Sequence, residues 1–115
     1  MEQDDLVIDR ELGIKLAGNK PDLANDMLHM LADSLPMEIN GMRQAKKCND
    51  MPELQKRLHR LYGAVCYCGL PRLKRVLATF ESALKHDEVS NLSQYFAELE
   101  FEVAQVIKQS SLLLK

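Results

Sequence analysis

The chain has 115 residues, of which 46% are hydrophobic and 28% are charged, with only five glycines and four prolines. This composition is typical of a single folded, soluble domain and excludes a disordered or collagen-like chain. The formal net charge of -2 supplies no overall basic field, so we expect neither nucleic acid nor a membrane surface as a partner.

The chain also lacks the patterns of export and membrane insertion. No stretch approaches the roughly 20 apolar residues of a membrane span. The acidic start MEQDD differs from the basic and then apolar start of a signal peptide. The three cysteines, Cys48, Cys66 and Cys68, form no even-numbered disulfide framework, which suits a reducing compartment. We therefore expect a cytoplasmic domain.

The first expected helix is short and follows a loose start, residues 1–6. Ile8, Leu12 and Leu16 recur every four residues, and Gly18-Asn19 is a typical helix stop. We expect this helix to lie across one end of a larger structure.

A second, long helix is expected from Pro21, a residue that suits a first helical turn. Pro36 should bend this helix. Its apolar stripe consists of Leu23, Met27, Met30, Leu31, Leu35, Ile39 and Met42.

The third helix is expected to begin near Met51. Asp50 can cap it, Pro52 fits its first turn, and Glu53 stands three residues after Asp50, as in a capping box. Its buried side should consist of Leu54, Leu58, Leu61 and Val65.

Two further helices complete the pattern. Pro71 opens a fourth helix that ends at His86-Asp87, with an apolar stripe of Leu70, Leu73, Leu77, Phe80 and Leu84. Ser90 or Asn91 caps a fifth helix, with a stripe of Leu92, Phe96, Leu99, Val103, Val106 and Ser110. No segment alternates as a strand would. Residues 1–115 should therefore form a single all-α domain, an antiparallel four-helix bundle with an additional short N-terminal helix.

His59 is expected on the outer side of the third helix. At about 100° per residue, the four apolar residues of that helix fall within roughly 60° of one another, and His59 falls about 130° from their centre. Gly63 lies one turn later on nearly the same outer face, where glycine costs about 0.5 to 1 kcal/mol relative to alanine. This pair indicates that a partner approaches the surface closely.

The run from His59 to Gly69, HRLYGAVCYCG, resembles the motif of the histidine phosphotransfer (Hpt) family. That motif has an exposed histidine followed by an apolar residue at +2, usually lysine at +3, glycine at +4, a small residue at +5 and glycine at +10. The matching residues are Leu61, Gly63, Ala64 and Gly69, whereas Tyr62 stands at the usual lysine position. The resemblance extends through ELGIKLAGNKPDLANDMLHML and GLPRLKRVLATFESAL, and it is greatest to the C-terminal Hpt modules of tripartite hybrid sensor kinases of the BarA/GacS type.

The resemblance implies a phosphorelay intermediate of two-component signal transduction. His59 would accept a phosphoryl group from the aspartate of one receiver domain and pass it to another. The resemblance also points to Glu81, on the next helix, as the acceptor that orients the imidazole. Lys56 and Arg60, at -3 and +1 of His59, are near enough to offer positive charge, and the hydroxyl of Tyr62 can donate a hydrogen bond.

The implied partners are the receiver domains of response regulators. The Mg²⁺ that phosphoryl transfer requires is expected on the receiver, so this domain would be a phosphocarrier without a cofactor, a metal or catalysis of its own. We expect a monomer in isolation. The chain could be a free protein, but we favour the cytoplasmic C-terminal domain of an inner-membrane sensor kinase.

Other interpretations remain open. A helical docking module could bind receiver domains without being phosphorylated, and Tyr62 in place of lysine is the best argument for it. A metal or thiol site at Cys66 and Cys68 is more distant, because a Cys-x-Cys pair on a helix diverges by about 200°. We interpret His29 as a helix flank and His86 as a helix end.

Overall fold

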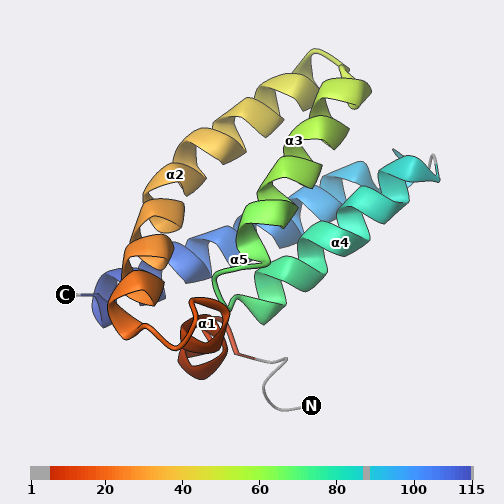
Figure 1. Ribbon diagram of the computed structural model, residues 1–115. Coiled ribbons are helices and arrows are strands. Elements are labelled where there is room, and N and C mark those ends of the chain that lie inside the picture. Colours follow the sequence, from red (N-terminus) through yellow and green to blue (C-terminus); the bar gives the residue numbers. More distant parts are fainter. Residues whose placement is uncertain (1–5, 87–88, 115) are drawn as a thin grey trace.

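The computed structural model describes residues 6–86 and 89–114. Within these ranges it contains five α-helices, one short 3₁₀ helix and no strand. The α-helices are α1 (Arg10–Leu16), α2 (Pro21–Lys47), α3 (Met51–Val65), α4 (Pro71–Lys85) and α5 (Leu92–Leu113), and the 3₁₀ helix η2 is Val89–Asn91. The long helices α2 to α5 run antiparallel to their neighbours, and α1 lies across one end (Figure 1). The predicted four-helix bundle with a short N-terminal helix is confirmed.

Most of the predicted helix boundaries agree with the structure. The carboxylate of Asp50 caps α3 by accepting the backbone N–H of Glu53 at 3.1 Å. The reciprocal half of the capping box does not form, because the Asp50 N–H donates to the Ala45 carbonyl at 2.8 Å. The Glu53 carboxylate accepts the Arg57 guanidinium at 2.8 Å. Asn91 is the N-cap residue of α5, although its side chain makes no capping hydrogen bond. The predicted loose start included residues 1–5, and the predicted end of the fourth helix included Asp87. These residues lie outside the described residues.

The core lies between the four long helices. The predicted stripes of α3 and α4 are buried, and Phe80 at the centre is fully enclosed. The Phe80 ring stacks on Tyr95 and meets Phe96 edge to face, each with a centroid separation of 5.5 Å. Such pairs stabilise a core beyond the area they bury. No helix among the described residues combines the length and apolar composition of a membrane span.

Two of the predicted stripes were partly wrong. On α2, Leu23 is 43% exposed and Met30 is 71% exposed. Both lie about 120° around the helix from the residues that face the core, so the predicted stripe covered too wide an arc. On α1, Leu12 and Leu16 are 37% and 41% exposed, because this helix packs through its buried Gly13 instead.

Gly69 fixes α1 to the turn between α3 and α4. The backbone N–H of Asp9 donates to the Gly69 carbonyl at 2.8 Å. Gly69 has a φ of +69°, and a Cβ there would stand 2.5 Å from the Asp9 carbonyl oxygen and 2.7 Å from the Gly13 nitrogen. Only glycine permits both the left-handed backbone and this close approach. The final glycine of the motif is therefore a folding requirement.

We predict that Gly69→Ala lowers the free energy of unfolding by about 3 kcal/mol or more, because backbone strain adds to a clash with backbone atoms. Gly18→Ala is the matched control, since Gly18 has the same φ of +69° but open space around it. The control should lose only about 1 to 2 kcal/mol. Urea unfolding monitored by circular dichroism measures both, and equal losses would contradict the close-approach argument.

Candidate functional site

His59 projects from the middle of α3 into solvent. Its neighbours Leu58 and Leu61 are 0% and 3% exposed, which fixes the orientation of this turn of the helix. The His59 side chain itself is 72% exposed. The structure thus places the imidazole where the sequence predicted it, outside the core and open to a partner.

Glu81 holds one nitrogen of the His59 ring. Its carboxylate comes from the edge of the α4 stripe, is 9% exposed, and lies with Oε2 2.8 Å from the Nδ1 of His59. A carboxylate accepts hydrogen bonds, so Nδ1 is the ring nitrogen that donates its proton. The other nitrogen, Nε2, then keeps a free lone pair. The exposed ring is therefore oriented and has one nucleophilic nitrogen.

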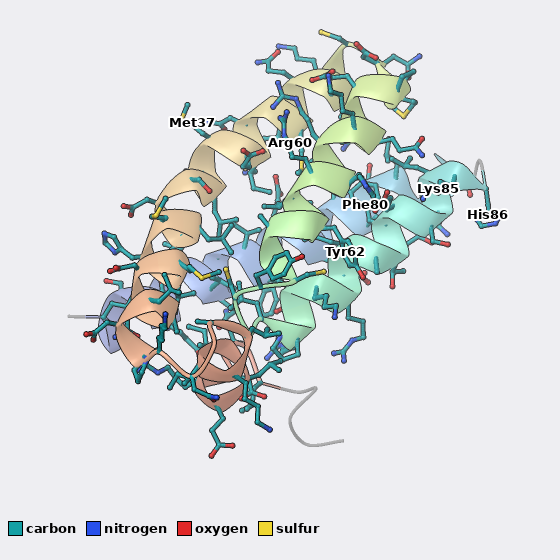
Figure 2. The ribbon with its side chains drawn as sticks, viewed as in Figure 1. Met37, Arg60, Tyr62, Phe80, Lys85 and His86 are labelled. Carbon is teal, nitrogen blue, oxygen red and sulfur yellow. The ribbon has the colours of Figure 1, made fainter. Side chains whose placement is uncertain are left out.

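Lys85 is a residue of the site that the sequence analysis missed. Its Nζ lies 3.6 Å from the same Oε2 of Glu81, and it projects from the C-terminal end of α4 (Figure 2). The signal was its place four residues after Glu81, on the same side of a helix. Lys56 and Arg60 are exposed, and within the described residues neither forms an ion pair or hydrogen bond with His59 or Glu81.

Gly63 leaves an open space beside the ring. It follows His59 by one turn of α3, and a Cβ built at this position would meet no atom within 4 Å. The two motif glycines thus have different surroundings, because backbone atoms enclose Gly69 whereas the space beside Gly63 is empty. Among the residues that the structure describes, no packing contact requires a glycine at position 63.

Tyr62 lies on the side of α3 that faces α4 (Figure 2). A hydrogen bond with Cys66 and repulsion from its thiolate form raise the pKa of the Tyr62 hydroxyl, and burial and the Glu81 carboxylate raise it further. The hydroxyl therefore stays protonated near neutral pH and can donate a hydrogen bond. It carries no positive charge, unlike the lysine that the motif usually has there.

A groove of about 380 Å³ lies between α1, α3 and α4. Its walls come from three helices and include Leu12, Leu16, Tyr62, Cys66, Lys74 and Ala78. The two exposed leucines of α1 thus form part of this groove. Tyr62, on the same helix as His59 and Gly63, is one of the residues that line this groove.

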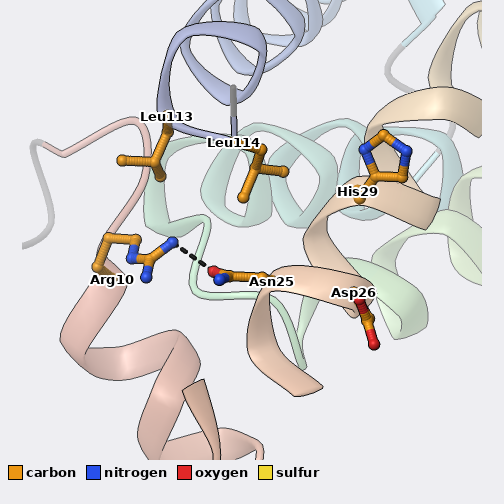
Figure 3. A pocket seen from close by; sticks show the side chains of 6 residues that line it. All are labelled: Arg10, Asn25, Asp26, His29, Leu113 and Leu114. Atoms are coloured by element: carbon orange, nitrogen blue, oxygen red, sulfur yellow. Dashed lines mark hydrogen bonds between the residues drawn. The ribbon is translucent and has the colours of Figure 1, made fainter. Parts of the chain in front are cut away.

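The other two histidines lie away from this surface. The Nε2 of His29 is 3.3 Å from the Asp33 carboxylate, and His29 borders a separate pocket between α1, α2 and the end of α5 (Figure 3). His86 is the C-cap of α4, and its Nδ1 lies 2.8 Å from the Ser82 carbonyl oxygen. His29 on the flank of a helix and His86 at a helix end agree with their predicted places.

The cysteines do not gather into a site. Cys66 lines the groove, whereas Cys68 is buried and points to the Ala64 carbonyl oxygen at 3.6 Å. Burial raises the pKa of the Cys68 thiol, which keeps it protonated and unreactive. Among the residues described, no three His, Cys, Asp or Glu side chains are grouped as metal ligands would be.

Comparison with known proteins identifies the family. The Hpt domain model matches residues 26–109. The chain is 42% identical to the sensor histidine kinase GacS of Pseudomonas protegens over 82 residues, which are 71% of this chain and 9% of that protein. It is 33% identical to the signal transduction histidine-protein kinase BarA of Escherichia coli K12 over 109 residues, 93% of this chain and 12% of BarA.

A solved structure agrees with this assignment. The Hpt domain of a sensor hybrid histidine kinase from Shewanella superposes with a TM-score of 0.85 at 35% identity, covering 94% of this chain and 93% of that one. The chain spans only about a tenth of the two kinases it matches. The chain belongs to the Hpt domain family, the phosphotransfer modules of two-component phosphorelays.

Proposed function

We propose that His59 is the phosphoacceptor of this Hpt domain, taking a phosphoryl group from a receiver aspartate and passing it to the aspartate of another receiver. The observation that supports this role is the 2.8 Å hydrogen bond from Nδ1 to a nearly buried carboxylate on a ring that is 72% exposed. That combination gives an oriented nucleophile which a second protein can reach.

The chemical step balances without any proton transfer. The lone pair of His59 Nε2 forms a bond to phosphorus as the bond between phosphorus and the aspartyl oxygen breaks, and that electron pair stays on the aspartate. The Nδ1 proton remains on the ring and keeps its hydrogen bond to Glu81, whose negative charge stabilises the resulting phosphoimidazolium. Phosphoryl transfer otherwise depends on positioning and on neutralising the phosphoryl oxygens.

The partner supplies the rest of the machinery in this proposal. The Mg²⁺ needed for transfer is held by the receiver, and this domain acts as a phosphocarrier without catalysis of its own. Positive charge from Lys56, Arg60 and Lys85 supports the phosphoryl group in place of a lysine at Tyr62. By analogy with the two kinases, the domain acts in the cytoplasm as the C-terminal part of a sensor kinase.

We predict that His59→Gln abolishes phosphoryl acceptance. Because the side chain is exposed, the free energy of unfolding should change by no more than about 0.5 kcal/mol. The measurement is acid-labile labelling from a phosphorylated receiver, together with urea unfolding of the same sample. Labelling retained in a folded His59→Gln variant would assign the phosphoryl group elsewhere, and an unlabelled wild-type chain would favour the docking module.

We predict that Glu81→Ala slows transfer by roughly tenfold to a hundredfold, because the imidazole loses the acceptor that orients it. Glu81→Gln keeps an acceptor oxygen and should lose less. Tyr62→Lys should change the rate only modestly if the existing cations already balance the phosphoryl charge. Rapid-quench kinetics of transfer measure all three, and an unchanged rate in Glu81→Ala would remove Glu81 from the site.

We predict that Gly63→Gln folds normally but fails to accept phosphate from a receiver. The new side chain would fill the open space through which a receiver brings its aspartyl phosphate to within about 3 to 3.5 Å of the ring. Phosphoramidate, a small donor, should still label His59 in this variant, which serves as the control for an intact nucleophile. Exchange with the receiver at the wild-type rate would show that the glycine is not needed for close approach.

A further inference from the structure

The outer face of α2 carries an exposed apolar line, which consists of Leu23, Met30 and Met37. These side chains are 43%, 71% and 78% exposed, and a spacing of seven residues places them nearly above one another. Figure 2 shows Met37 on the side of α2 that faces away from α3. Aligned, exposed methionines are typical of surfaces that pack against another protein.

A polar line runs beside the apolar line with the same spacing. It consists of Asp26, Asp33, Asn40 and Lys47, all of which are exposed. Each of the first three follows a residue of the apolar line by three positions, so the two lines are neighbours on one face. The charge along the polar line changes from negative to positive toward the C-terminus of α2.

The helix dipole explains only part of this distribution. Acidic residues in a first turn and basic residues in a last turn stabilise any single helix, and Asp22, Lys46 and Lys47 occupy such positions in α2. That effect is confined to the end turns, whereas Asp33 lies roughly three turns inside the helix. It also gives no reason to expose Met30 and Met37.

The polar line is complementary to itself about a two-fold axis. Asp26 and Lys47 lie equally far from the centre of the line, and so do Asp33 and Asn40. In an antiparallel contact, Lys47 of a second copy would come level with Asp26. Met37 would lie beside the axis and so close to Met37 of the second copy, whereas Met30 would come level with Arg43. A parallel contact would instead place like charges level with each other.

The polar groups are available for such a contact. Within the described residues, neither Asp26 nor Lys47 has a side-chain hydrogen bond or ion pair, and the Asp26 carboxylate is directed away from Arg10 (Figure 3). The Asn40 side-chain oxygen accepts the Arg43 guanidinium at 3.0 Å. Its amide N–H groups can donate to the Asp33 carboxylate of the second copy, whose Oδ2 also lies 3.3 Å from the Nε2 of His29.

We propose that the outer face of α2 binds a second copy of this chain in an antiparallel, two-fold symmetric contact. The surface between α3 and α4 is not part of this contact, so both His59 rings stay open to receivers. A contact made by one helix face is small, and a dissociation constant between about 1 μM and 1 mM is expected. This proposal differs from the monomer that the sequence led us to expect, and the oligomeric state in solution distinguishes the two.

Sedimentation equilibrium of the 115-residue chain, from about 10 μM to 1 mM, tests the proposal. The wild type should form a dimer, and Met37→Glu should raise its dissociation constant at least about tenfold. Leu112→Glu is the matched control, because Leu112 is 64% exposed but lies on α5, and it should have no effect. A wild-type monomer throughout, or equal effects of the two variants, would overturn the proposal.

An exchange of charges tests the antiparallel pairing. Asp26→Lys and Lys47→Asp should each weaken the dimer, because each places like charges level with each other. The double variant should restore the dissociation constant to within about threefold of the wild type. Circular dichroism checks that each variant is folded. A double variant that associates as weakly as the single variants would exclude this pairing.

Discussion

The functional surface depends on the register between α3 and α4. Leu58 and Leu61 on one helix and Leu77 and Phe80 on the other belong to a single buried core, and their interdigitation fixes which residues at the helix edges meet. A shift of one residue along α4 would turn Glu81 by about 100° away from α3. The 2.8 Å bond from Glu81 to His59 is therefore a surface contact whose geometry is set by interior packing.

Much of the fold could be predicted because each helix repeats its apolar residues on the side that its neighbours cover. The outward orientation of His59 could be predicted in the same way. The buried leucines of α3 lie on the same helix, and they fix the direction in which a residue between them points. The openness at Gly63 also followed from its angle. Periodicity therefore predicts on which side of its own helix a residue lies.

Periodicity does not predict which residues of two neighbouring helices come into contact. Glu81 lies at an edge of its stripe, and the expectation that it meets His59 came from family resemblance instead of from its angle. Lys85 shares the same carboxylate oxygen, yet its spacing alone did not distinguish it from other exposed lysines. Met30 has the hydrophobicity of a core residue, and hydrophobicity does not tell which arc of a long helix its neighbours cover.

The hydrogen bond between Nδ1 and Glu81 has a consequence for the direction of the proposed transfer. Because the proton stays on Nδ1, the phosphorylated ring is a cation beside a carboxylate, and the group that leaves when phosphate departs is a neutral imidazole. Acceptance and release then pass through the same atoms in the same protonation states. In the proposed relay, the net direction of transfer is then set by the relative stabilities of the two aspartyl phosphates and not by a change of protonation at the histidine.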